Sequence, residues 1–277
     1  MQVFSIWYKG FDGEYCLAQL PESHGDDYIL IDHKGKEVSL PENCSPQSSF
    51  SDGLAIIWNY SDNLYGFIDP DGNVVIEPQY EVAYEFSEGL ACVKLIDGQW
   101  AMIDVNNNII MLRPDRADYN LSSQYCSHGL IRCALPDTDT IVYYDREGKE
   151  AFSLQIEGLD WITEFRDNGV AFFIVDPAVQ EYKDGQYSFG LINDKGEIVT
   201  QPVYWNDGYN WEFSDGLFAA SEHDTGKSGY LDECGQWAFP PVEGHLGPFH
   251  EGVGRIYKYP DVIFVDREGN ELYRYAQ

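Results

Sequence analysis

The feature that most constrains the fold of this chain is an internal repeat that runs through most of its 277 residues. A short apolar run ends in Asp or Asn, two residues follow, and Gly or Asn comes next. The element occurs seven times, with its leading residue at Asp32, Asp69, Asp104, Asp145, Asn193, Asp232 and Asp266. A period of roughly 20 to 50 residues is typical of solenoids, propellers and related arrays.

A second element keeps the same period. Phe50-Ser51-Asp52-Gly53-Leu54 recurs at 86–90 and 213–217, and weaker copies begin at Cys126, Phe165 and Phe249. Its Gly precedes the leading residue of the first element by 14 to 16 residues, except in the fifth unit, where an insertion lies between about residues 176 and 187. The two elements together predict one β-repeat domain over 1–277, with units at about 10–49, 50–85, 86–125, 126–164, 165–212, 213–248 and 249–277.

The chemistry of the first element predicts hairpin turns. An Asp or Asn side chain accepts a hydrogen bond from the backbone two residues on, and Gly takes the left-handed conformation that closes a short loop. The predicted turn residues are Asp32, Gly35, Asp69, Gly72, Asp104, Asp145, Gly148, Asn193, Gly196, Asp232, Gly235, Asp266 and Gly269. The flanking runs are rich in Val, Ile, Tyr and Phe, as in 74–76 and 141–144, which favours strands.

Each unit is therefore predicted to contain about three strands, followed by a loop that often carries Pro and an aromatic residue, as in 78–80 and 202–204. In the second element, Phe is the predicted core anchor and Gly allows a sharp entry into the next strand. Sustained helical spacing of apolar residues is absent from the sequence, so the fold class is all-β. A unit this small cannot bury a core alone, so neighbouring units must stack.

These residues carry a family resemblance. The stretch 65–80 reads YGFIDPDGNVVIEPQY and is followed by FSEGLA at 86–91, which closely resembles the WG-repeat (KWG-repeat) family of bacteria. The second and fifth units match best, although the Trp-Gly pair stands as Tyr65-Gly66, Trp100-Ala101, Phe189-Gly190 and Ser228-Gly229. The resemblance implies a β-repeat array of bacterial cytoplasmic and surface proteins, with no general catalytic activity and no settled ligand.

Seven units favour a seven-bladed β-propeller, because closure protects the strand edges. The alternative is an open, curved array of stacked β-hairpins.

Net charge narrows the choice of partners. The chain carries 17 Lys and Arg against 47 Asp and Glu, a formal charge of −30 at pH 7. Such a chain repels nucleic acid and anionic membrane surfaces, so neither is an expected partner. The apolar runs are too short to span a bilayer, and the N-terminus lacks the pattern of a signal peptide, so we expect a cytoplasmic protein.

Motifs of catalysis, metal binding and cofactor binding are missing from the sequence. There is no nucleophile elbow, no phosphate-binding loop and no Cys-x-x-Cys pair, and the six His residues share no ligand spacing. Residues 69–73 resemble the start of a calcium loop, but Tyr80 stands where the last acidic ligand would be. We expect no enzyme, no cofactor and no metal; the enzymatic alternative is a hydrolase, which would require a deep pocket with paired carboxylates that the sequence does not single out among 47 acids. We expect Cys16, Cys92 and Cys133 to be buried thiols.

Two segments are candidates for binding. The aromatic cluster at 204–211 contains Trp205, Tyr209 and Trp211, whose rings either face a sugar or a protein, or wedge between units. The insertion at 176–185 contains Tyr182, and insertions in repeat proteins often lie on the binding face. The leading hypothesis is a non-catalytic protein–protein interaction module, in its sharpest form an acidic immunity or inhibitor protein for a basic partner. The alternative is a glycan- or cell-wall-binding module.

Overall fold

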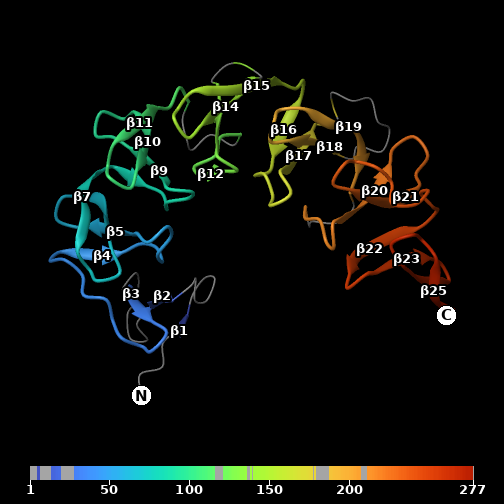
Figure 1. Ribbon diagram of the computed structural model, residues 1–277, viewed down its shortest axis with the longest axis horizontal. Helices are drawn as coiled ribbons and strands as arrows, with labels where there is room; N and C mark the ends of the chain where they lie inside the picture. The colour runs from blue at the N-terminus through green and yellow to red at the C-terminus, as the bar shows by residue number, and fades with distance from the viewer. Residues whose placement is uncertain are drawn as a thin grey trace. The chain divides into compact units, whose positions relative to one another are not determined.

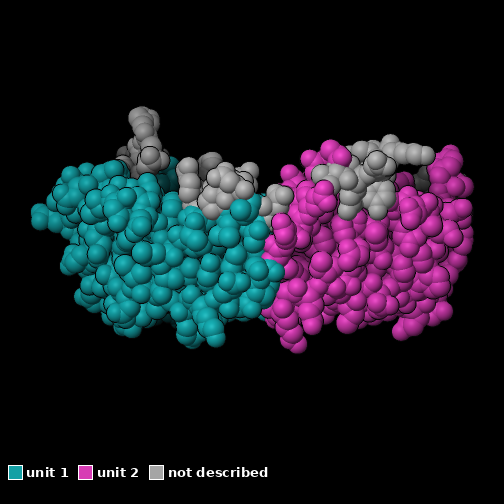
Figure 2. Space-filling model, turned by 90° about the horizontal axis from the view of Figure 1, so that it is seen from above, with its two compact units in different colours: residues 1–153 teal, residues 154–277 magenta. Residues whose placement is uncertain are grey.

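The structure is a computed structural model that describes residues 5–6, 14–19, 28–115, 121–135, 138, 140–176, 178, 187–206 and 211–276. The described residues form antiparallel strands joined by tight turns, with no helix among them, which confirms the all-β repeat prediction. The chain divides into two compact units, residues 1–153 and 154–277 (Figure 2).

In unit 1 the described strands form four consecutive sheets of the propeller-blade type (Figure 1). The first contains β1 (Ser5–Ile6), β2 (Tyr15–Gln19) and β3 (Tyr28–Asp32). The second contains β4 (Cys44–Pro46), β5 (Ala55–Asn59), β6 (Leu64–Ile68) and β7 (Val74–Tyr80). The third contains β8 (Val82–Ala83), β9 (Leu90–Lys94), β10 (Trp100–Asp104) and β11 (Ile109–Leu112). The fourth contains β12 (Cys126–Ser127), β13 (Leu130–Ala134), β14 (Thr140–Asp145) and β15 (Glu150–Gln155), within which the division between the units falls.

In unit 2 the described strands form two sheets (Figure 1). The six-stranded sheet contains β16 (Leu159–Ile162), β17 (Val170–Val175), β18 (Ser188–Asn193), β19 (Ile198–Trp205), β20 (Leu217–Glu222) and β21 (Ser228–Asp232). This sheet comprises strands of two repeats, β16–β19 and β20–β21. The two sets are linked by only two residue pairs between β19 and β20, Tyr204–Glu222 and Trp205–Ser221. The last sheet contains β22 (His245–His250), β23 (Val253–Lys258), β24 (Asp261–Val265) and β25 (Glu271–Ala276).

The structure adds a fourth strand to the three that the sequence predicts for a repeat. In the second sheet, β4 precedes the Phe-Ser-acid-Gly turn, and the turn is itself a hairpin. Ser51 and Leu54 exchange two backbone hydrogen bonds, with N–O distances of 2.9 and 3.0 Å. The two residues between them, Asp52 and Gly53, both have positive φ, 49° and 80°. This is the hairpin geometry that matches the natural twist of the flanking strands.

The Trp-Gly position is explained by a bulge in the neighbouring strand. Tyr65 pairs with Tyr80 and Phe67 with Ile76, so three residues of β7, at 77–79, face Gly66 alone. The prediction of a loop at 78–80 is therefore wrong, because this segment bulges within the strand and pairs again at Tyr80. A Cβ atom on Gly66 would lie 2.5 Å from the carbonyl oxygen of Ile76 and 2.6 Å from the nitrogen of Pro78. Glycine is therefore required wherever a repeat contains this bulge, and the same close approach occurs at Gly190.

The core lies between successive sheets. Phe86, the aromatic residue of its Phe-Ser-acid-Gly turn, is buried and packs edge-on against Phe67 of the preceding sheet, with ring centroids 4.9 Å apart. Phe165 and Phe249, at the same position in other repeats, are also buried. Cys16, Cys92 and Cys133 are buried free thiols, as the sequence predicts.

The hairpin turns have the predicted side-chain cap. Oδ1 of Asp69 accepts hydrogen bonds from the backbone N–H groups of Asp71, at 3.0 Å, and Asn73, at 2.9 Å. The same pair of bonds forms at Asp32, Asp104, Asp145, Asn193, Asp232 and Asp266. The hydrogen bond from the Asn73 side chain contributes most, and these backbone bonds contribute less, to holding the pKa of Asp69 below its ordinary value.

Asp69→Asn is expected to fold normally, because Asn193 already caps the equivalent turn. Because the pKa of Asp69 is lowered in the folded state, its carboxylate stabilises the wild type at pH values above 3.8, the ordinary pKa of Asp. This stability is lost as the pH falls through the lowered pKa. The stability difference between wild type and variant should thus be largest near pH 7 and vanish in acid. Urea unfolding between pH 7 and pH 3 measures it, with Asp71→Asn as the control; a difference that stays constant with pH would contradict the argument.

A candidate binding site at a repeat junction

The Phe-Ser-acid-Gly turn of one repeat is hydrogen-bonded to the corresponding turn of the next. The Ser51 hydroxyl donates to the carbonyl oxygen of Phe86 at 2.6 Å, and the Asp52 carboxylate accepts from the N–H of Gly89 at 2.6 Å. We call this pair of contacts, from the serine and the acid of one turn to the backbone of the next, a latch. It gives the serine and the acid of the second sequence element a role that the sequence alone does not reveal.

Two further latches follow the same pattern. Ser87 donates to the carbonyl oxygen of Cys126 at 2.8 Å, and Glu88 accepts from the N–H groups of His128, at 2.9 Å, and Gly129, at 2.7 Å. In unit 2, the hydroxyl of Ser214 donates to the carbonyl oxygen of Phe249, and Asp215 accepts from the N–H of Gly252 at 2.7 Å.

An arginine reinforces two of the three latches. Arg146 directly follows the leading Asp of its hairpin, and its guanidinium donates to the carbonyl oxygen of Glu88. Arg267 occupies the same position in its own repeat and donates to the carbonyl oxygen of Asp215. The residue before the turn glycine is therefore held twice, through its side chain and through its carbonyl.

Glu88→Ala tests the strength of a latch. Burial alone would raise the pKa of Glu88, but the backbone hydrogen bonds from Gly129 and His128 outweigh it and leave the pKa below its ordinary value. The variant loses two charge-assisted backbone hydrogen bonds and the weaker contact from the Cys126 thiol, at a carboxylate that is only partly shielded from water. We therefore expect the free energy of unfolding to fall by about 1–2 kcal/mol. Chemical denaturation measures the loss.

The control is Glu251→Ala. Glu251 has the same left-handed conformation, with φ 48°, but accepts no hydrogen bond from any residue that the structure describes. A loss as large as that of Glu88→Ala would show that the backbone conformation, and not the latch, is responsible.

The junction between the β16–β19 repeat and the β20–β21 repeat departs from this pattern. Its turn, 165–169, contains one more residue than the others, and Arg166 replaces the serine. Arg166 and Val170 form the base of this wider turn, with an N–O distance of 3.0 Å. Among the described residues, nothing in the turn accepts a hydrogen bond from the N–H of Gly216, the equivalent of Gly89 and Gly252.

The arginine is also replaced at this junction. Glu233 directly follows the leading Asp232 and thus occupies the position of Arg146 and Arg267. Its carboxylate lies close to Gly216, since a Cβ atom on that glycine would be 3.7 Å from Oε1 of Glu233.

A cavity of about 630 Å³ lies at this junction. Phe165 and Phe213 form the apolar part of its wall. The charged residues of the lining are Arg166, Asp167, Glu212 and Glu233, and Asn168 and Gly216 complete it. Three carboxylates against one guanidinium make the cavity acidic. Arg166 is 3.7 Å from the carboxylate of Glu212 and 3.5 Å from the carbonyl oxygen of Trp211, so its own contacts are long.

The structure places the predicted binding residues in different environments. Trp211 is half-buried and packs against the core residues Phe172, Phe189 and Phe218, at centroid distances of 5.6, 5.4 and 6.0 Å. Trp205 is half-buried on β19. Tyr209 and Tyr182 lie outside the described residues.

The predicted aromatic segment nevertheless borders the cavity, because Glu212 and Phe213 directly follow Trp211. A smaller cavity of about 320 Å³ lies on the other side of Glu212 and is lined by residues that include Leu217, His245 and Tyr257.

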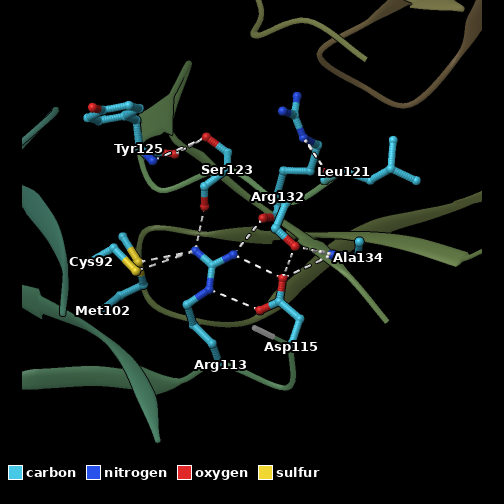
Figure 3. A network of polar contacts seen from close by, with 10 residues as sticks. Cys92, Met102, Arg113, Asp115, Leu121, Ser123, Tyr125, Arg132 and Ala134 are labelled. Carbon is cyan, nitrogen blue, oxygen red and sulfur yellow. Dashed lines mark hydrogen bonds and ion pairs between the residues drawn. The ribbon is translucent and has the colours of Figure 1, made fainter. Parts of the chain in front are cut away.

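A buried ion pair in unit 1 forms the most extensive polar network among the described residues (Figure 3). The side chains of Arg113 and Asp115 are both 0% exposed, and the guanidinium forms two parallel hydrogen bonds with the carboxylate, at 3.0 and 3.1 Å. Arg113 also donates to the carbonyl oxygens of Ser123, at 2.7 Å, and Arg132, at 2.9 Å. Arg113, Asp115, Ser122, Ser123 and Arg132 are all buried, which fits a structural role for the ion pair.

Arg113 occupies the position that Tyr80 holds in the second repeat and Tyr204 in the fifth. Its N–H donates to the carbonyl oxygen of Trp100, whereas Tyr80 pairs with Tyr65 at the corresponding place. Its guanidinium lies near the sulfur atoms of Cys92 and Met102 (Figure 3). Burial raises the pKa of the Cys92 thiol to about 11, which keeps this thiol protonated at neutral pH.

Neither a metal site nor a membrane-spanning helix occurs among the described residues. They hold no group of three or more His, Cys, Asp or Glu side chains placed to bind a metal. They also include no helix with the length and apolar character needed to cross a membrane.

Comparison with known proteins identifies the repeat. Residues 65–100 and 189–224 match the family model described as the WG containing repeat, which confirms the resemblance at the second and fifth units. A search among curated proteins gave no match.

Solved structures resemble the chain at low sequence identity. A crystal structure of the eukaryotic initiation factor matches with a TM-score of 0.52 and 14% identity, over 89% of this chain and 70% of that one. BamB from Moraxella catarrhalis matches with a TM-score of 0.44 and 10% identity, over 96% and 86% of the two chains. Hsv2p from Kluyveromyces lactis matches with a TM-score of 0.45 and 9% identity, over 95% of each chain.

Proposed function

We propose that this chain, which contains WG repeats, is a non-catalytic module that binds a basic protein. The observation that carries the proposal is the acidic cavity at the one described turn-to-turn junction in unit 2 where the latch is missing. A protein that only needed to be stable would be expected to keep the serine and the acid there, as the junction at Ser214 and Asp215 does.

The net charge supports the same partner. A formal charge of −30 on 277 residues creates a field that extends beyond the surface and speeds encounter with a positively charged protein. An immunity or inhibitor protein that neutralises a basic toxin, such as a nuclease, is the sharpest form of the proposal. A cytoplasmic location belongs to this form, because such a protein meets its target inside the cell.

The glycan alternative depends on exposed aromatic faces at 204–211. Trp205 and Trp211 are both half-buried, and Trp211 packs against core rings, so neither ring presents a fully open face. The described residues therefore favour the protein partner.

The test is capture of partners from a lysate of the source organism at about 50 mM and about 500 mM salt, where the screening length falls from more than 10 Å to about 4 Å. We expect a basic protein that binds at low salt and is released at high salt. An empty capture at both salts, or a partner that is indifferent to salt, would contradict the proposal.

A matched pair of variants assigns the binding to the cavity. Asp167→Asn, Glu212→Gln and Glu233→Gln together remove three charges from its lining. Asp71→Asn, Glu147→Gln and Glu268→Gln remove three charges from exposed hairpin turns. We expect the cavity variant to bind about tenfold more weakly and the turn variant to bind nearly as the wild type does.

A further inference from the structure

We propose that the cavity between the turn at 165–169 and the β20–β21 repeat receives an arginine side chain of the partner. This inference rests on the proposed function and names the group that the cavity recognises. An arginine supplied by a second protein would complete the junction in the way that Arg146 and Arg267 complete two others within the chain.

The first argument is the equivalence of positions. Arg146 and Arg267 each follow the leading Asp of a hairpin and donate to the carbonyl oxygen of the residue before the turn glycine of the preceding repeat. At the open junction the hairpin position holds Glu233, so the chain's own guanidinium is replaced by a carboxylate. The group that is missing is thus a guanidinium, and the group in its place attracts one.

The second argument is the set of acceptors. The residue before the turn glycine is here Asn168, whose carbonyl oxygen accepts no hydrogen bond from any described residue. The carboxylates of Asp167, Glu212 and Glu233 line the same cavity. A guanidinium has five N–H donors in a fixed plane and can bond a carboxylate and a carbonyl oxygen together, whereas the ammonium of lysine acts as a compact point charge.

The third argument is the wall of the cavity. Phe165 and Phe213 lie in the lining beside the acids. A planar guanidinium on an apolar stem packs against aromatic rings as well as against charge.

The chain's own Arg166 does not satisfy these acceptors. Its guanidinium lies 3.7 Å from the carboxylate of Glu212 and 3.5 Å from the carbonyl oxygen of Trp211, so both contacts are long. With Arg166 included, the lining still carries three negative charges against one positive, which leaves two for an incoming cation.

The first experiment is an NMR titration of the isolated protein with N-acetyl-arginine N-methylamide. We expect saturable shifts of the backbone amide signals of Asn168 and Gly216. The lysine analogue should bind at least about threefold more weakly, the effect of one hydrogen bond. Equal binding of the two compounds, or shifts scattered over the whole acidic surface, would overturn the assignment of arginine to this cavity.

The second experiment uses Glu233→Arg, which supplies the missing guanidinium within the chain. We expect the variant to keep its fold, to lose the arginine-induced shifts and to lose binding of the captured partner. Glu268→Arg, with the same change of charge on an exposed hairpin turn, is the control and should behave as the wild type. If Glu233→Arg does not fold, Glu233→Gln replaces it, with an expected weakening of about threefold to tenfold.

The outcomes separate the two proposals. A basic partner that binds wild type and Glu233→Arg equally would overturn the arginine site and leave the proposed function in place. Arginine-specific shifts with no partner captured at either salt would support the arginine site and count against the proposed function.

Discussion

Asp115→Ala is expected to lower the free energy of unfolding by about 3–5 kcal/mol, among the largest effects of any single substitution in this chain. The guanidinium of Arg113 would then be buried with two carbonyl acceptors and no counter-charge. The hydroxyl of Ser122 would lose its acceptor as well, and the N–H of Ala134 would keep only the Ser122 oxygen of its two acceptors.

Urea unfolding of wild type and variant measures the loss. The double variant Arg113→Met, Asp115→Ala should recover much of the stability, because it removes the charge together with its partner and places a thioether beside Met102 and Cys92. Glu243→Ala, which breaks the exposed pair with Lys258, is the control and should cost less than about 1 kcal/mol. An Asp115→Ala variant as stable as this control would refute the account of the network.

Gly66→Ala is expected to cost about 2–3 kcal/mol, because its methyl group would collide with backbone atoms that cannot turn away. The carbonyl oxygen of Ile76 would lie 2.5 Å from the new Cβ, and the bulge in β7 would have to open. The loss should appear as a lower urea midpoint with an unchanged dependence on denaturant, since the surface exposed on unfolding is nearly the same.

Ala101→Gly is the matched control. Ala101 occupies the place of Gly66 in the next repeat, where it pairs directly with Leu112 and no bulge faces it. The reverse substitution should cost about 1 kcal/mol, from chain entropy and a lost buried methyl group. A Gly66→Ala variant less destabilised than Ala101→Gly would contradict the steric explanation.

The parts of the fold that sequence analysis predicts correctly depend on neighbours along the chain. Each hairpin turn needs only its leading Asp and the backbone two and four residues on, as at Asp69. The same locality explains why the spacing of the two elements reveals the repeat, and why the fifth unit is recognised as a WG repeat despite its insertion.

The features that the sequence does not reveal depend on residues far apart in the chain. The latch joins Asp52 to Gly89, and the buried network joins Arg113 to the carbonyl of Arg132. Neither partnership has a local signal, and Arg113 in particular reads as an ordinary surface residue. The cavity had two visible signs, the replacement of serine by Arg166 and the extra residue in the same turn, but their meaning depends on knowing what the serine does elsewhere.

The latch also bears on how a chain of this kind can lengthen. The turn at 86–90 presents a serine and an acid toward the following repeat and backbone atoms toward the preceding one, so the two halves of the joint lie on opposite sides of one short motif. Duplication of the DNA for a single repeat copies both halves at once, and the new repeat is compatible with its neighbours from the start. Families built on such a joint can change their repeat number in one genetic event, without a period of selection to create a new interface.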